Sequence, residues 1–397
     1  MIGFVPLQPY RRLLALPSVP SSMLLMFFAR LPVTAMGITL TLHVVSDLGR
    51  GYGEAGLVGT ASTAGSALGA PLVGRMIDRY GLRPVVLVCG TVSATYFLST
   101  PHLPYLALVL VALPAGVLAV PAGSIARQVL SALVPETQRR TAYSLDTVSL
   151  EVTFMIGPAA GILLSTQFSS AVALTSIGVL SGVVAALLYL TNPPVRAGHE
   201  TITGTRPPLR SWLSAELTAT LLIAVGALFV LVGMELAALA SLRENGEVGW
   251  TGVVIAVMCV ASLAGGIVHG AVHRSLSQVT LMVLLAVLTI PVGLVDSPWW
   301  LLALVLVPAN VVCAPTIAAT TEAVTSLAPV RVRGEAMGLQ DSATRIGLAL
   351  GGPVVGFVMD HSSPGWGFAA SGLGGLLLAS TGILLRLRFR TRTAVAS

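Results

Sequence analysis

The side chains in this sequence that could do chemistry are ionisable and polar groups inside long apolar stretches. Arg30 and Thr34 lie in the first apolar stretch, and Glu151, Glu235 and Asn310 lie in later ones. An ionisable group in apolar surroundings is costly, so it usually faces a water-filled path, a bound solute or an opposite charge. We therefore predict that these five residues line the path of a proton or of a small substrate.

Arg30 and Glu151 are the opposite charges that match best in depth. Arg30 lies about eight residues into its apolar stretch and Glu151 about ten residues into another, which corresponds to depths of roughly 12 and 15 Å at the helical rise per residue. We predict that the two side chains pair. The sequence is equally consistent with a fixed structural ion pair and with a pair that takes up and releases a proton.

The other ionisable groups in apolar stretches have less defined roles. Glu235 has no charged neighbour in the sequence, so it is either a proton-carrying carboxylate or a hydrated group near the surface. Asp341 and Arg345 have the i, i+4 spacing of a local ion pair on one helix face. Arg127 and His269 also fall within apolar stretches.

The composition excludes a soluble protein and several kinds of enzyme. Hydrophobic residues make up 55% of the 397 residues and charged residues only 10%, far below the share in soluble domains. All 22 basic residues are arginines, so a phosphate-binding loop ending in Gly-Lys and a lysine Schiff base are both absent. Cys89, Cys259 and Cys313 have no metal-binding spacing. We expect the protein to need no cofactor and no metal, and to take any energy it uses from an ion gradient, a concentration gradient or a partner.

Proline, glycine and charge divide the sequence into twelve apolar stretches that could form membrane-spanning helices. A bilayer core requires about 20 apolar helical residues, and each stretch is close to that length. The predicted spans are 22–45, 55–77, 84–101, 104–128, 141–165, 170–191, 213–241, 250–272, 278–295, 299–326, 335–359 and 366–385.

The distribution of arginines predicts the orientation of these spans. Cytoplasmic loops hold an excess of positive charge, and placing the N-terminus inside puts 17 of the 22 arginines in inner segments. Only Arg50 and Arg243 then lie in outer loops. We predict a multi-pass protein of the plasma (inner) membrane with both termini cytoplasmic. The net charge of +6 follows from this rule, so we expect no nucleic-acid partner.

Short motifs recur at offsets of 194 to 196 residues, which indicates an internal duplication. The matching pairs are Gly53-x-x-Gly56 with Gly249-x-x-Gly252, Pro135-x-x-x-Arg139 with Pro329-x-x-x-Arg333, and Gly157-Pro158-x-x-Gly161 with Gly352-Pro353-x-x-Gly356. An ordered series at one offset predicts two six-helix bundles in parallel. We divide the chain into a first half at 1–191, a cytoplasmic linker at 192–212 and a second half at 213–397. A substrate site then lies between the halves near the membrane midplane. We also predict that Asp341 and Arg345 are charges between the two halves.

The loop after the second span carries the most specific motif, Gly74-Arg-Met-Ile-Asp78-Arg79-Tyr-Gly81-Leu-Arg83. Gly74 permits close helix approach, Gly81 permits a tight turn, and Asp78 can sit at the N-terminus of a neighbouring helix. This motif resembles the cytoplasmic loop signature of the major facilitator superfamily. The resemblance implies an inner gate, in which Asp78 or Arg79 contacts the start of the eleventh span. The alternative is a solvated basic turn.

The sequence Gly157-Pro158-x-x-Gly161 resembles the end of a signature that proton-coupled exporters of this superfamily carry in their fifth helix. Proline kinks a helix and the flanking glycines allow another helix to come close, so a rocking interface could pivot there. The longer pattern that normally precedes it is absent. Because Gly352, Pro353 and Gly356 repeat it, an ordinary kink inherited by duplication is an equally good interpretation.

The resemblance implies an all-α integral membrane protein that acts as a secondary active transporter. We expect the two halves to rock around a small-molecule substrate in the bilayer, in a monomer that uses protons as the coupling ion. Efflux of an amphipathic or drug-like compound is the preferred function, and uptake of a sugar or metabolite is the alternative. A membrane-embedded enzyme is a remote third possibility, since the sequence has neither His-Glu-x-x-His nor Gly-x-Ser-x-Gly.

Overall fold

The computed structural model describes residues 8–196, 207–272, 275–295 and 297–395, and these residues contain helices but no β-strand. A short helix, α1 (Gln8–Leu14), precedes the first predicted span. The helices that match the first six spans are α2 (Val19–Leu42, continued by a π-turn at His43–Asp47), α3 (Tyr52–Tyr80), α4 (Leu82–Ser99), α5 (Tyr105–Val117) with α6 (Ala122–Leu133), α7 (Arg139–Gln167) and α8 (Ser170–Thr191).

The remaining helices match the other six predicted spans. A one-turn helix, α9 (Leu209–Trp212), comes first, and it is followed by α10 (Ala215–Glu244), α11 (Thr251–Ala271), α12 (Gln278–Thr289, extended by a 3-10 turn to Leu294), α13 (Trp299–Leu327), α14 (Arg333–Asp360) and α15 (Pro364–Val395). Serine hydroxyls cap the starts of three helices by accepting a backbone N–H, at Ser169, Ser214 and Ser277.

One predicted span is not a continuous helix. The span at 104–128 consists of α5 and α6, which are separated by residues 118–121. Pro121 has no N–H to donate and disfavours a helical conformation of the residue before it, so the first helix ends and a second begins at Ala122. The predicted span is confirmed, because Tyr105–Leu133 is one of the stretches long and apolar enough to cross a membrane, but it contains a break that the sequence analysis did not predict.

Within the described residues, ten helical stretches are long and apolar enough to cross a membrane, and Gln278–Leu294 is a shorter apolar helix. The remaining predicted span, α3, has 29 residues but is rich in glycine, alanine, serine and threonine. Its small residues serve helix packing: a Cβ at Gly65 or Gly69 would lie 2.2 or 2.0 Å from backbone oxygens of α5. The chain therefore has the all-α architecture of a multi-pass membrane protein, as the sequence predicted.

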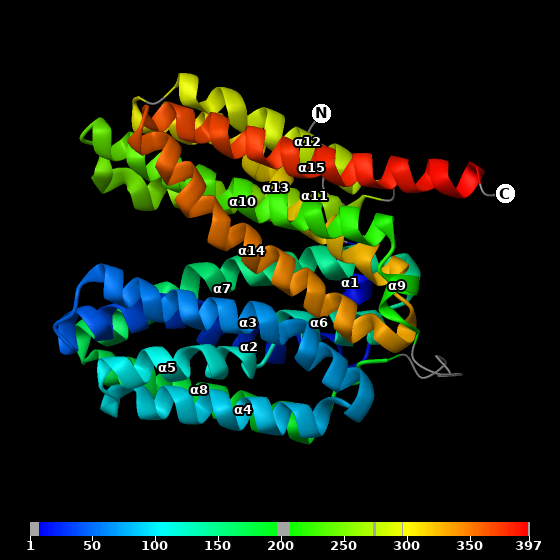
Figure 1. The fold of residues 1–397 in the computed structure, drawn as a ribbon, viewed down its shortest axis with the longest axis horizontal. Coiled ribbons are helices and arrows are strands. Elements are labelled where there is room, and N and C mark those ends of the chain that lie inside the picture. Colours follow the sequence, from blue (N-terminus) through cyan, green and yellow to red (C-terminus); the bar gives the residue numbers. More distant parts are fainter. Residues whose placement is uncertain (1–7, 197–206, 273–274, 296, 396–397) are drawn as a thin grey trace.

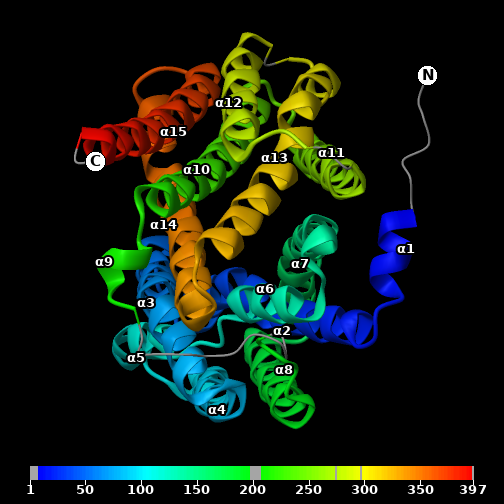
Figure 2. The ribbon, with the colours of Figure 1, turned by 90° about the vertical axis from the view of Figure 1, so that its right-hand side faces the viewer.

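The long helices form two layers, which we call the first group (α2–α8) and the second group (α10–α15) (Figure 1). Turning the molecule shows α4 and α8 at one extreme and α12 and α15 at the other (Figure 2). These four helices correspond to the third, sixth, ninth and twelfth predicted spans, which contain no Asp, Glu, Arg or His, so lipid-facing positions suit them. Between the groups, α3 contacts α14 and α7 contacts α11 and α13.

Candidate functional site

Asp78 joins the first group to the second. It lies near the end of α3, and its two carboxylate oxygens accept the backbone N–H groups of Gly334 at 3.1 Å and of Glu335 at 2.9 Å. Those N–H groups belong to the first turn of α14, where they have no partner within their own helix and favour a negative charge. This is the contact with the start of the eleventh span that the sequence predicted for Asp78.

The glycines of this motif have the two roles expected from the sequence. A Cβ at Gly74 would lie 2.2 Å from the carbonyl oxygen of Gly334, so only glycine permits this approach of α3 and α14. Gly81 has a φ of +82°, which allows the chain to turn from α3 directly into α4. The close helix contact and the tight turn therefore both depend on glycine.

The basic residues of the motif do not contact α14 through any described ion pair. The Arg79 guanidinium lies 5.1 Å from the centre of the Tyr80 ring, and Arg83 donates a hydrogen bond to the carbonyl of Tyr189 in α8. Instead, Arg196, which follows α8, lies 3.6 Å from a carboxylate oxygen of Asp78. Sequence reasoning missed Arg196 because 118 residues separate it from Asp78 along the chain.

We predict that Gly74→Val weakens this interface. Valine has no room there, so either the helices separate or neighbouring backbone moves, at a cost of about 1–3 kcal/mol. Thermal unfolding of the purified variant would show this as a lowered midpoint. Gly59→Val is the matched control, because Gly59 lies in the same helix with no atom within 4 Å of its Cβ position. Equal midpoints for the two variants would contradict the close approach.

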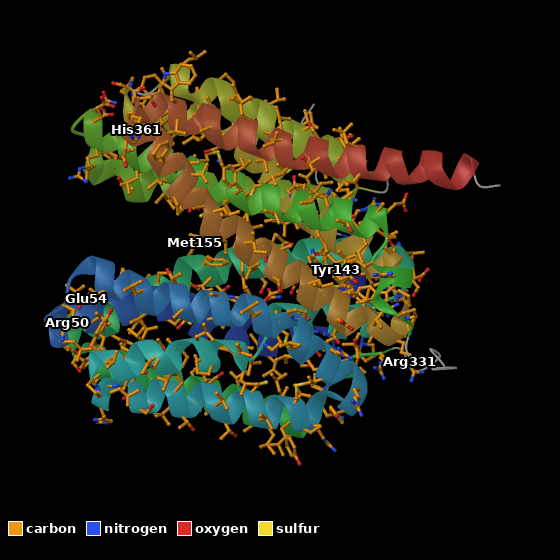
Figure 3. All side chains as sticks on the ribbon, in the orientation of Figure 1. Arg50, Glu54, Tyr143, Met155, Arg331 and His361 are labelled. Carbon is orange, nitrogen blue, oxygen red and sulfur yellow. The ribbon has the colours of Figure 1, made fainter. Side chains whose placement is uncertain are left out.

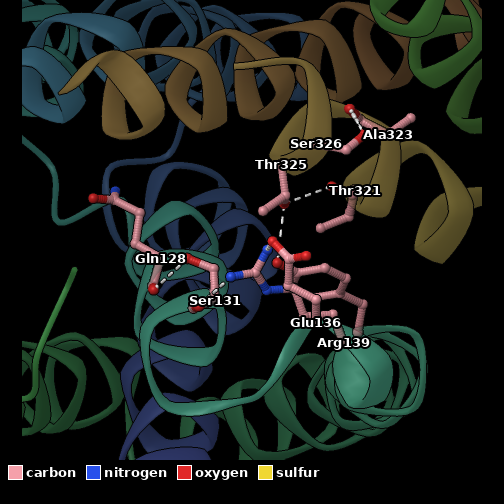
Figure 4. A network of polar contacts seen from close by, with 9 residues as sticks. Gln128, Ser131, Glu136, Arg139, Thr321, Ala323, Thr325 and Ser326 are labelled. Atoms are coloured by element: carbon pink, nitrogen blue, oxygen red, sulfur yellow. Dashed lines mark hydrogen bonds and ion pairs between the residues drawn. The ribbon is translucent and has the colours of Figure 1, made fainter. Parts of the chain in front are cut away.

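Further polar contacts between the two groups lie at the same end of the molecule. Figure 4 shows where α6 and α7 meet α13, with Ser131 and Arg139 near Thr325 and Thr321. The contacts that join the first part of the chain to the second group at this end are Tyr10 to the carbonyl of Ile267 (2.6 Å), Arg140 to Glu322 (3.2 Å), Thr141 to the carbonyl of Gly270 (2.6 Å) and Tyr143 to Thr325 (2.9 Å).

The two groups are farther apart at the other end. We call the end with α1 and Arg331 the Arg-rich end, and Figure 3 places Arg50, Glu54 and His361 at the opposite end. Toward that opposite end, Met155 of α7 is 42% exposed and Val354 of α14 is 46% exposed. Large apolar side chains at the boundary are thus uncovered. The polar contacts described above lie at the Arg-rich end, and the ribbons of the two groups diverge toward the opposite end (Figure 1).

A cavity of about 110 Å³ lies between the groups, near the middle of the helices. Its charged lining comes from Arg30, Arg127, Asp341 and Arg345, and Thr34 borders it as well. Arg345 donates to the Asp341 carboxylate at 2.9 Å, which is the local i, i+4 pair that the sequence predicted. The cavity therefore brings together charges from α2, α6 and α14.

The predicted pair of Arg30 and Glu151 was wrong, because Arg30 pairs with Asp146. The Nη2 atom of Arg30 donates to both carboxylate oxygens of Asp146, at 2.7 and 2.9 Å, and Nη1 donates to its backbone carbonyl at 3.3 Å. Both residues are buried. Helical side chains point back toward their helix N-terminus, so Arg30 reaches a level nearer the Arg-rich end than its Cα. Glu151 lies five residues farther on, about 7.5 Å along the axis.

Glu151 instead accepts a hydrogen bond from Ser262 of α11, at 3.0 Å, and so links the two groups. Glu235 of α10 is only partly buried, and the charge of Glu151 acts on it. Within the described residues, neither carboxylate has an ion pair with a basic side chain. Neither residue is among those that line the cavity, so the structure does not bring these two carboxylates together with Arg30 and Thr34 as the sequence predicted.

Asn310 does not face the substrate cavity in this conformation. It is 1% exposed, and its side-chain nitrogen donates to the carbonyl of Leu306, one turn earlier in the same helix. Asn310 is also absent from the lining of the central cavity, so its predicted place on the substrate path stays a prediction. The sequence shows an amide in an apolar span but not that its own helix satisfies it.

The glycines around Pro158 pack α7 against α2. A Cβ at Gly157 would lie 2.1 Å from the Thr34 hydroxyl, and one at Gly161 would lie 2.5 Å from the Thr39 hydroxyl. In α14, which contains Pro353, Gly352 has no atom within 4 Å and Gly356 has only an ordinary contact. In α14 the close contacts are instead made by Gly347 and Gly351, which pack against α10. In both groups these glycines therefore join helices of the same group.

Arg127 is the residue that sequence reasoning undervalued. Its side chain is 4% exposed, lines the cavity and has no hydrogen bond or ion pair with any described residue. The only sequence signal was its position inside an apolar span. No group of three or more metal-binding side chains occurs in the described part of the chain.

Comparisons with known proteins agree on the fold. The profile of the Major Facilitator Superfamily matches residues 22–295. No curated protein sequence matches. The solved human organic anion transporter MFSD10 (TETRAN) is 18% identical, with 95% of this chain and 99% of that chain covered and a TM-score of 0.71.

Two other solved structures are similar over most of their length. The proton:xylose symporter XylE is 12% identical, with 90% of this chain and 92% of that chain covered and a TM-score of 0.70. A bacterial homologue of the iron transporter ferroportin, in an outward-facing state, is 14% identical, with 92% and 98% covered and a TM-score of 0.71. At these identities the likeness shows the fold.

Proposed function

The chain belongs to the major facilitator superfamily and is a transporter, and we propose that it exports a small amphipathic solute in exchange for protons. The observation that carries this proposal is the cavity between the two groups of helices, which the Asp78 contact joins at the Arg-rich end. Two duplicated halves around a central site are suited to alternating access by rocking. The two groups are the moving bodies in this proposal.

We place the protein in the plasma membrane, with the Arg-rich end on the cytoplasmic side. The positive-inside rule supports this orientation, because the turns at that end contain most of the arginines. The cavity then opens outward in the conformation described here, and Asp78, Gly74 and Gly81 form the inner gate. Transport requires these inner contacts to break while contacts form at the outer end.

The carboxylates of Glu151 and Glu235 are the proposed proton carriers. They lack a basic partner among the described residues, so they can bind and release a proton without disrupting an ion pair. Glu151 also bonds across the boundary to Ser262, and a change in its protonation acts directly on a contact that must break during rocking. The apolar lining of the cavity, which includes Phe154 and Leu348, favours an amphipathic solute over a sugar.

Transport by purified protein in liposomes tests this function. We expect an imposed pH gradient to drive accumulation of amphipathic solutes, and Glu151→Gln with Glu235→Gln to abolish accumulation while leaving solute exchange intact. Glu244→Gln, an exposed carboxylate in α10, is the matched control and should behave as wild type. Gradient-driven movement of sugars alone would favour the uptake alternative, and no solute movement would refute the transport proposal.

A separate prediction concerns orientation. Single cysteines replacing the exposed residues Ser211 and Ser326 should react with a membrane-impermeant thiol reagent only from the cytoplasmic side. Cysteines replacing Phe168 and Ser362, at the opposite end, should react only from outside. The native cysteines must first be replaced by serine or alanine. Labelling of Ser211→Cys and Ser362→Cys from the same side would contradict the arrangement.

A further inference from the structure

We propose that the central cavity binds an organic monoanion whose acidic group pairs with Arg127. This inference rests on the proposed function, since it names the substrate class of the same cavity. Arg127 lies in α6, the short helix after the break at residues 118–121. It is the cavity's one guanidinium without a hydrogen bond or ion pair to a described residue.

The charges around the cavity leave one positive charge uncompensated. Arg30 is neutralised by Asp146 at 2.7 Å, and Arg345 by Asp341 at 2.9 Å. Asp341 and Asp146 are also the carboxylates whose charges act on Arg127, but each already has its own arginine. Three guanidinium groups thus share two carboxylates, and the site has a net charge of +1.

An unpartnered guanidinium in such a place indicates a missing partner. The Nη1 atom of Arg127 is fully buried with no acceptor among the described residues. A buried charge without a counter-ion is strongly disfavoured, so a chain that places one beside a cavity leaves it for a ligand charge. Arginine suits this role because its planar fork can donate two parallel hydrogen bonds to one carboxylate.

The surroundings of Arg127 also accommodate an apolar group. Leu150, Phe154 and Leu348 line the same cavity. A second cavity, lined mostly by the first group, is bordered by Met36 and Phe97 and shares Val33 and Arg345 with the central one. An anion held at Arg127 can therefore place its apolar body along these side chains. The substrate class is an amphipathic monoanion rather than a dianion or a polyol.

A set of three probes with one carbon skeleton tests the charge requirement: 3-phenylpropanoate, 3-phenylpropanamide and 3-phenylpropylammonium. The purified full-length protein is heated in detergent with each probe, because a ligand of the folded state raises the unfolding midpoint. We expect only the anion to raise it. Arg127→Gln should weaken anion binding by about tenfold or more, as expected for loss of a charge-assisted pair, and should raise the midpoint of the ligand-free protein. Arg127→Lys should bind more weakly than wild type but more tightly than Arg127→Gln.

Arg243→Gln is the matched control, because it removes an exposed positive charge far along the chain from the cavity and should leave binding unchanged. Equal effects of the anion and the amide, or unchanged anion binding by Arg127→Gln, would overturn the proposal. Binding of the anion without transport would refute the proposed function alone. Gradient-driven transport of the amide or the ammonium compound in preference to the anion would refute this inference alone.

Discussion

Removing the Arg30 guanidinium alone, as in Arg30→Met, is expected to cost about 3–5 kcal/mol of folding stability. The change leaves the Asp146 carboxylate buried without its two hydrogen bonds from Arg30 and without a counter-charge, and the Asp146 backbone carbonyl loses a third. Asp146→Leu should be similarly damaging, since it leaves Arg30 unpaired. The double variant removes both charges together and should recover most of the lost stability. Thermal unfolding of the four proteins forms a double-mutant cycle that measures the coupling.

Arg345→Met with Asp341→Leu provides the comparison pair. Both side chains are somewhat more exposed than those of Arg30 and Asp146, at 18% and 11%, and the pair forms within one helix, so its coupling should be smaller. If the coupling free energy of Arg30 and Asp146 is no larger than that of Arg345 and Asp341, then burial does not strengthen the Arg30–Asp146 pair. Additive losses in the single and double variants would contradict any pairing.

The same double variant separates the two interpretations of the pair. Asp146 is held at both carboxylate oxygens by Arg30, which favours a structural role linking α2 to α7. We therefore expect Arg30→Met with Asp146→Leu to fold and to retain gradient-driven transport. Loss of accumulation with intact exchange would instead make this pair part of the proton path, in place of Glu151 and Glu235.

The sequence was sufficient for features that depend on local composition. Hydropathy located the spans, because a helix crossing a bilayer must be apolar over a fixed length. The Asp78 contact could be predicted because glycine spacing and a helix start are both visible in the sequence. The break before Ala122 was missed, although Pro121 marks it, because proline within a membrane span often kinks a helix without ending it.

Features that depend on tertiary registration could not be predicted in the same way. The pairing of Arg30 with Glu151 was predicted from the depths of their Cα atoms in the membrane. The Arg30 side chain points back toward the start of its helix, so it reaches Asp146 instead. Nothing in the sequence shows that Ser262 reaches Glu151 or that Leu306 satisfies Asn310. Arg127 has no hydrogen bond or ion pair to a described residue, and this can be seen only when the positions of all the side chains around the cavity are known.

The inner gate gives the second large effect: Asp78→Asn is expected to shift the protein away from the state closed at the Arg-rich end. Asparagine has one carbonyl oxygen and one NH₂ group, so it cannot accept from both Gly334 and Glu335. One backbone N–H then faces a donor, and the attraction of a carboxylate for the start of α14 and for Arg196 is lost. A loss of about 1–2 kcal/mol corresponds to a shift of roughly five- to thirtyfold in the conformational equilibrium.

A reporter cysteine replacing Thr325, which is buried near Tyr143 at the closed end, measures this shift. Its reaction with a membrane-impermeant reagent added at the cytoplasmic side should be faster in Asp78→Asn, and net transport should fall while the amount of protein in the membrane stays constant. Arg79→Gln is the matched control, because Arg79 belongs to the same motif but lies over Tyr80. Unchanged reactivity in Asp78→Asn, or an equal increase in Arg79→Gln, would show that the Asp78 contact does not hold the gate. The rate would then depend on Gly74 and the close helix packing it permits, which Gly74→Val tests independently.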